Sequence, residues 1–174
     1  PRNIYKKALL QNNIAAIYST QGNLNEALTA MKTTINSLNS FLKSDIPDNK
    51  RAAATEFLFS AIENYAGIYK SMGDYQKALE LLLYANKEKQ RYFDAENPEI
   101  FKSKILLGQI NFELKDYKKA NFYLDNGIKQ IEKTSGDNYL WNADAHYSMA
   151  LVNDALGKTD NATQNFDKSE RLYN

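Results

Sequence analysis

The residue types best suited to catalysis or metal binding are scarce, and His146 is the only histidine in the chain. The nearby Asp144 and Asp154 do not complete a convincing set of metal ligands at helical spacing. A Ser-His-Asp triad would need the same histidine, and we expect that side chain to pack between helices instead. We therefore interpret His146 as a residue that packs in the core, not as a catalytic or metal-binding residue.

A second candidate is Gly157-Lys158-Thr159, which has the form of the end of a phosphate-binding loop. That loop requires a glycine five residues before Gly157, where Val152 stands, so we interpret the triplet as a turn between helices. Asn161-Ala162-Thr163 matches a glycosylation acceptor. Because its alanine is expected to be buried in a helix, we regard this match as chance.

Carboxylates and thiols offer no catalytic site either. Acidic residues fall mostly at expected helix starts or opposite lysines, as Asp116 and Glu113 do, and we interpret them as caps and solvated faces. The chain has no cysteine, which excludes disulfides, thiolate metal sites and cysteine nucleophiles. The sequence therefore predicts no catalytic residue, no metal, no cofactor and no enzymatic activity.

The composition also limits the classes of partner. The chain has 174 residues, of which 22 are basic and 21 acidic, and a net charge of +1 gives no electrostatic footprint for nucleic acid or an anionic membrane. No apolar run approaches the roughly 18 residues that cross a bilayer, and no signal segment opens the chain. We expect neither nucleic-acid binding nor membrane insertion. Localisation is left open, with a soluble, cytoplasmic protein favoured.

The chain is organised by an internal repeat. An alanine opens the second of two predicted helices four times, at intervals of 51, 42 and 42 residues: Ala27, Ala78, Ala120 and Ala162. The clearest copy is the stretch 66–78, whose sequence predicts a helix, a tight turn and a second helix. Within it, Gly73 is suited to the positive φ that ends a helix, and Asp74 is suited to cap the next one.

Amphipathic periodicity divides the chain into four helix pairs at about 1–47, 48–97, 98–137 and 138–174. The first helix is expected to begin near Pro1, and the segment 44–49 to break the second. Asn97-Pro98-Glu99 predicts a helix start, and 135–138 a break between helices. The nine extra residues of the first interval are expected to lengthen its helices or its loop.

The pattern Ile62-x2-Tyr65-Ala66-x2-Tyr69, followed by Ala78-x3-Leu82, resembles the tetratricopeptide repeat. The 42-residue interval is similar to the repeats of kinesin light chains and of bacterial scaffolds and sensors. Asn111 and Asn153 depart from the family pattern, which has tyrosine there. The resemblance implies an all-α, right-handed superhelix of about four helix pairs, a single solenoid over 1–174, whose first helices line a concave groove.

In the register of this family, the groove-facing residues lie 18, 15, 14, 11 and 8 positions before each repeated alanine. Asn13 and Asn64 match the position at which peptide-binding members place an asparagine, whose amide can pair with both N–H and C=O of an extended peptide. Their alternative role is that of tolerated polar surface. The predicted partner-binding residues are Asn12, Asn13, Glu63, Asn64, Lys70, Ile105, Gln109, Phe112, Tyr147 and Leu151.

Four of these, Ile105, Phe112, Tyr147 and Leu151, would make the second half of the groove apolar, and exposed apolar patches tend to mark interfaces. Their alternative role is to pack on a neighbouring repeat. The leading hypothesis is a non-enzymatic module that binds a peptide or a protein partner in the groove.

Two other hypotheses remain open. The chain could be a regulatory or sensory segment of a larger protein whose catalytic domain lies outside it, because Phe166, Leu172 and Tyr173 give the last helix core-like spacing instead of a polar outer face. We accordingly expect the chain to be part of a longer protein. Self-association through the same repeat ends is the third hypothesis.

Overall fold

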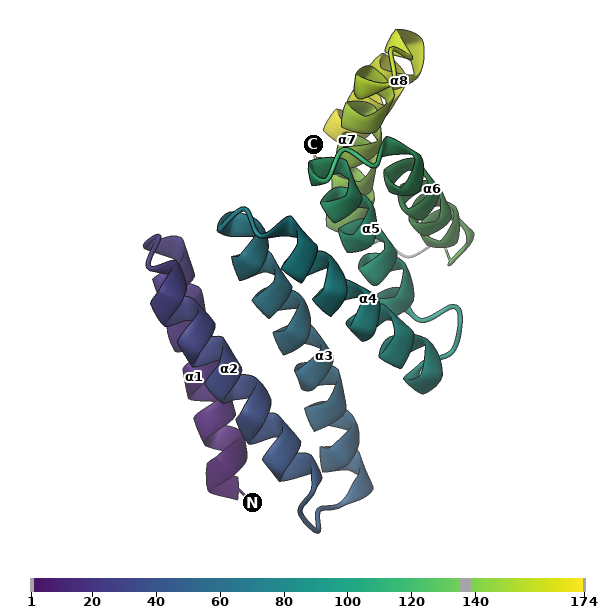
Figure 1. Ribbon diagram of the computed structural model, residues 1–174. Helices are drawn as coiled ribbons and strands as arrows, with labels where there is room; N and C mark the ends of the chain where they lie inside the picture. The colour runs from purple at the N-terminus through teal and green to yellow at the C-terminus, as the bar shows by residue number, and fades with distance from the viewer. Residues whose placement is uncertain (1, 135–138, 174) are drawn as a thin grey trace. The chain divides into compact units, whose positions relative to one another are not determined.

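The computed structural model describes residues 2–134 and 139–173 (Figure 1). These residues form eight α-helices and no strand, which confirms the prediction of an all-α fold. The predicted break at 135–138 lies outside the described residues. In chain order the helices are α1 (Arg2–Thr20), α2 (Leu24–Leu42), α3 (Asp48–Ser71), α4 (Tyr75–Tyr92), α5 (Pro98–Glu113), α6 (Tyr117–Thr134), α7 (Tyr139–Ala155) and α8 (Thr159–Tyr173).

The chain divides into two compact units, Pro1–Leu81 and Leu82–Asn174, and the division falls inside α4. In unit 1, α1 packs against α2, and α3 lies against both (Figure 1). In unit 2, α5 pairs with α6 and α7 with α8, while α7 also packs on α5 and α6. Three of the helix pairs that the repeat predicts, α1–α2, α5–α6 and α7–α8, are therefore packed within a unit, whereas the division inside α4 separates the parts of the remaining pair. None of the described helices combines the length and the apolar composition needed to cross a membrane.

In each of the four repeats, one tight turn separates the two helices. Each turn has one residue with left-handed backbone geometry, five positions before the repeated alanine. The following residue donates its N–H to the carbonyl five positions back, at 2.8–3.0 Å, a bond that closes a Schellman motif. Glycine occupies the left-handed position in three turns, which confirms the predictions for Gly73 and for the 157–159 triplet. The residues and φ angles are Gly22 (77°), Gly73 (80°), Lys115 (61°) and Gly157 (71°).

The long first interval of the repeat is explained mainly by α3. This helix has 24 residues against 16 in α5. It begins 30 residues before Ala78, whereas α5 begins 22 residues before Ala120. Residues 48–55 of α3 thus form about two helical turns that α5 lacks. Of the two predicted ways to place the extra residues, the lengthened helix is the one observed.

The small residues of the repeat let paired helices approach closely. The four repeated alanines are all buried. In the α5–α6 pair, a Cβ placed on Gly108 would lie 2.5 Å from Leu124 Cγ, well inside van der Waals contact. Gly108 is therefore a site where the absence of a side chain sets the distance between two helices. Asn111, at a position where the family has tyrosine, is also buried, and its Nδ2 donates to the Leu107 carbonyl at 2.7 Å.

The start of α5 is fixed by three local interactions. The side chain of Asn97 accepts a hydrogen bond from the Glu99 backbone N–H at 2.9 Å, and Pro98 occupies the first turn, as predicted. Glu99 Oε2 lies 2.6 Å from Nζ of Lys89, whose side chain is fully buried. Burial raises the pKa of the Glu99 carboxyl, but the hydrogen bond and charge of Lys89, with a contribution from Lys102, lower it below its ordinary value overall.

Candidate functional site

In unit 2, α5 and α7 are the first helices of their pairs, and two side-chain contacts join them. Lys102 Nζ lies 5.0 Å from the centroid of the Trp141 ring, a cation–π distance. Gln109 Nε2 donates to Ser148 Oγ at 3.1 Å. Because the two contacts are seven residues apart on both helices, α5 and α7 run parallel and in register. We call the face that carries Gln109, Phe112, Tyr147 and Leu151 the unit 2 inner face.

The apolar side chains of this face differ in how much surface they offer. Phe112 and Leu151 lie one turn beyond the Gln109–Ser148 bond on their helices, and both are half-buried. Phe112 packs against the unit 2 core, the buried hydrophobic cluster that contains Leu124 and Ile128. The centroid of its ring lies 5.7 Å from that of Tyr117. Tyr147 remains 49% exposed, with its ring 5.7 Å from that of Phe166. Tyr147 is therefore the predicted apolar residue that a partner could reach most readily.

Ile105 does not lie where the sequence placed it. Its side chain is 0% exposed and belongs to the unit 2 core with Phe101, Leu124 and Ile128. The expectation that Ile105 lines a groove is therefore wrong. The alternative is packing on a neighbouring repeat, and the core cluster of Ile105 contains residues of its own repeat as well as Met149 and Val152 of the next one. The reason for the burial of Ile105 is the close approach of α6, since a Cβ on Gly127 would lie only 3.2 Å from Ile105 Cγ1.

The predicted residues of unit 1 lie on α1 and α3, which contact each other. Asn13 and Asn64 are exposed, so their amides are open to solvent. Asn12 is half-buried, and its Oδ1 is buried without a hydrogen-bond partner among the described residues. Lys70 is half-buried, whereas Glu63 is only 7% exposed and offers little surface to a partner. Peptide pairing by Asn13 and Asn64 stays a prediction that this geometry permits.

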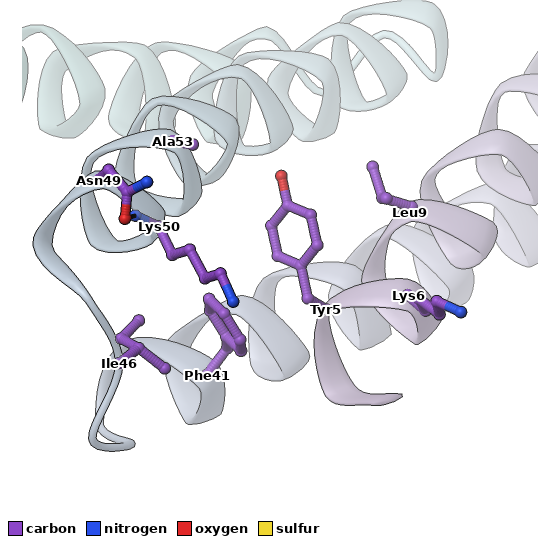
Figure 2. Close-up of a pocket in the computed structure, with 8 residues that line it drawn as sticks. All are labelled: Tyr5, Lys6, Leu9, Phe41, Ile46, Asn49, Lys50 and Ala53. Atoms are coloured by element: carbon purple, nitrogen blue, oxygen red, sulfur yellow. Dashed lines mark hydrogen bonds between the residues drawn. The ribbon is translucent and has the colours of Figure 1, made fainter. Parts of the chain in front are cut away.

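Unit 1 also contains a pocket of about 570 Å³ that the sequence did not predict (Figure 2). Helix α1 contributes residues of its first half, α2 a phenylalanine of its last turn, and α3 residues of its first turns. The loop between α2 and α3 contributes an isoleucine. We call this the α1–α3 pocket, and the residues that line it are Tyr5, Lys6, Leu9, Phe41, Ile46, Asn49, Lys50 and Ala53.

The floor of the α1–α3 pocket is aromatic. The ring of Tyr5 lies 5.1 Å from that of Phe41 and 6.1 Å from that of Phe57. Arg51 holds the adjacent loop in place, with Nη1 donating to the Leu42 carbonyl at 2.5 Å and Nη2 to the Ser44 carbonyl at 3.3 Å. The pocket is thus formed by packed rings and a fixed loop, not by a chance gap between surface side chains.

Two sequence signals pointed toward this pocket without defining it. Leu9 occupies the groove-facing register 18 positions before Ala27, and the long first interval indicated extra structure near 44–49. The three lining residues of α3, Asn49, Lys50 and Ala53, all fall within the two additional turns of that helix. Nothing in the local pattern indicated that these turns would face α1.

The residues considered for catalysis occupy structural positions. His146 is buried, and its Nδ1 lies 2.8 Å from Asn165 Oδ1. Burial lowers the pKa of His146 below its ordinary value, more strongly than its bond to Asn165 raises it, so the ring is neutral at pH 7. Among the described residues, no group of three or more His, Cys, Asp or Glu side chains could hold a metal ion.

No protein-family model matches the sequence, and no curated protein matches it significantly. Solved structures match the fold well. BtubC (BKLC) from P. vanneervenii has 16% identity and a TM-score of 0.75, over 95% of this chain and 63% of its own. A putative kinesin light chain from Podosopora anserina, with nearly identical TPR-like repeats, has 18% identity and a TM-score of 0.70, over 95% of this chain and 74% of its own.

A third structure is a Rap protein complexed with Competence and Sporulation Factor. It has 17% identity and a TM-score of 0.75, and the match covers 97% of this chain and 43% of the Rap chain. The chain thus spans less than two thirds of the length of BtubC and of this Rap protein. At such low identities the likeness establishes the fold alone. The chain has the all-α fold of tetratricopeptide-like helical repeat proteins.

Proposed function

We propose that this chain is a non-enzymatic module that binds a peptide or an exposed segment of a protein on its first-helix faces. The observation that supports this most directly is the unit 2 inner face. There, Tyr147 is 49% exposed and the half-buried Leu151 follows it one turn later on α7, while a hydrogen bond holds α7 against α5, which carries the half-buried Phe112. Aromatic anchors on a rigid surface are typical of binding hot spots.

Rigidity matters because a surface that is already ordered loses little conformational entropy when a partner binds. The Gln109–Ser148 hydrogen bond and the Lys102–Trp141 contact fix α5 against α7 before any partner arrives. A preorganised surface needs less binding energy to order itself, so more of the apolar contact appears as affinity. The proposal is supported by the similar fold of a Rap protein that is complexed with Competence and Sporulation Factor.

The test is selection of peptides from a random displayed library with the purified chain, followed by affinity measurement of the selected peptides by fluorescence anisotropy. Tyr147→Asp is the test variant, because the exposed ring can be replaced without opening the core. Phe122→Asp is the matched control, since Phe122 is also exposed in unit 2 but lies on α6, a second helix. We expect Tyr147→Asp to weaken binding about tenfold or more and Phe122→Asp to leave it unchanged.

A library that yields no peptide above background would overturn the proposal. So would selected peptides that bind Tyr147→Asp as tightly as the native chain. Sedimentation at the assay concentration separates peptide binding from self-association through exposed helix ends, because only self-association gives a mass that rises with concentration. Circular dichroism of both variants confirms that helix content is retained.

A further inference from the structure

We propose that the α1–α3 pocket is a second peptide site, which takes one large apolar side chain from an acidic segment while Lys6 and Lys50 pair with the carboxylates beside it. This inference rests on the proposed peptide-binding function and adds the chemistry of the partner. It is supported by the lining of the pocket, by its charge, and by the part of the chain that builds it.

The interior of the pocket suits an apolar group. Rings of Tyr5 and Phe41 form its floor, and Leu9 and Ile46 add aliphatic surface. Its volume of about 570 Å³ falls within the range of about 300–1,000 Å³ of ligand pockets. Ala53 on α3 has too small a side chain to fill the space. An inserted phenylalanine or leucine side chain would therefore be removed from water on several sides, which is the main source of affinity for apolar anchors.

The rim of the pocket is positively charged. Both Lys6 on α1 and Lys50 on α3 are exposed, and neither has an ion-pair partner among the described residues. The eight lining residues include these two cations and no acid. In Figure 2 the side chain of Lys50 extends from α3 toward Phe41 and Tyr5, whereas Lys6 projects from α1 away from these two residues. Asp48 opens α3 but does not line the pocket. A bound carboxylate would therefore meet the ammonium group of Lys50 directly, and that of Lys6 after rotation of its exposed side chain.

The α3 residues that line the pocket have no counterpart in α5. The α3 wall of the pocket consists of Asn49, Lys50 and Ala53, which all belong to the turns that lengthen α3 relative to α5. The α1 wall includes Leu9, which lies one turn before Asn13 on the same helix face. An extended segment that runs along this face past Asn13 could therefore place one side chain in the pocket. This continuity favours a peptide over an isolated small acid.

The experiment measures the binding of four probes to the native chain by fluorescence anisotropy, or by competition where a probe carries no label. The first is a labelled, end-blocked Gly/Ser peptide with a central phenylalanine flanked by aspartates. The second has alanine in place of phenylalanine, the third has lysines in place of aspartates, and the fourth is free 3-phenylpropionate. We expect saturable binding of the first probe alone, weakened by added salt because exposed charges are screened.

Two variants test the site itself. The double variant Lys6→Glu/Lys50→Glu reverses the rim, and Ala53→Phe fills the interior from an exposed helix position. Lys7→Glu/Lys32→Glu is the matched control, because it makes the same change in net charge at exposed lysines of unit 1 that do not line the pocket. We expect each test variant to weaken the first probe about tenfold and the control to leave its affinity within about twofold.

The proposal is overturned if the first probe shows no saturable binding up to about 1 mM. It is also overturned if Ala53→Phe binds that probe normally, if the lysine probe binds equally well, or if 3-phenylpropionate binds as tightly as the peptide. Circular dichroism shows whether each variant is folded, and a misfolded Ala53→Phe is replaced by Ala53→Leu. The Tyr147→Asp variant separates the two proposals: it should lose library-selected peptides of the unit 2 inner face but retain the first probe.

Discussion

Replacing Gly108 with alanine tests whether its missing side chain sets the distance between α5 and α6. The new Cβ would lie 2.5 Å from Leu124 Cγ, 2.8 Å from Leu124 Cδ2 and 3.3 Å from the Ala120 carbonyl oxygen. Normal carbon contacts are about 3.5–4.0 Å, so Leu124 must change rotamer or the helices must separate by about 1 Å. Overpacking of this kind costs about 1–3 kcal/mol.

The matched control is Gly67→Ala, because Gly67 is also a helical glycine but nothing lies within 4 Å of its added Cβ. Both substitutions gain about 0.5–1 kcal/mol from the higher helix propensity of alanine. We therefore expect Gly67→Ala to raise the free energy of unfolding by about that amount. For Gly108→Ala, a clash near the upper end of the overpacking range leaves a net loss of about 2 kcal/mol.

Urea unfolding followed by circular dichroism measures both changes. The double variant Gly108→Ala/Leu124→Ala adds a third measurement, because removing the Leu124 side chain removes the clash. The two substitutions should then be non-additive, with the double variant less unstable than the sum of the single ones. The reasoning is refuted if Gly108→Ala stabilises the chain as Gly67→Ala does, or if the double variant is strictly additive.

Three further substitutions have definite expected outcomes. Lys115→Gly should raise the free energy of unfolding by about 1 kcal/mol in urea unfolding, because Lys115 is a non-glycine residue at a φ of 61°. Glu99→Gln should lower it by about 2 kcal/mol at pH 7, because it removes the negative charge that pairs with the Lys89 ammonium group. Since the folded pKa of Glu99 is lowered, its contribution is present above pH 4.5 and lost as the pH falls through the folded pKa, so the native and Glu99→Gln chains should converge in acid. His146→Gln should flatten the loss of stability below pH 6.5 in a pH series of urea midpoints, because the lowered pKa of His146 makes the unfolded chain bind the proton more tightly.

The repeat register predicted which residues belong to the first-helix faces, but it did not predict their exposure. The position 15 residues before each repeated alanine shows this well. Asn12 is half-buried there, Glu63 is 7% exposed, Ile105 is 0% exposed and Tyr147 is 49% exposed. Register depends on the 3.6-residue period and is local, whereas exposure depends on how closely a neighbouring helix approaches, as α6 does at Gly127.

The sequence by itself determined the all-α fold, the helix pairs, the tight turns and the start of α5. These features depend on residues within a few positions of one another, such as a glycine before an aspartate or an asparagine before a proline, so they can be deduced from spacing alone. Only the tertiary structure decided that Ile105 is core, that Tyr147 is open, and that the extra turns of α3 form a pocket with α1 and α2. Those outcomes depend on contacts between segments far apart in the chain, which no local pattern specifies.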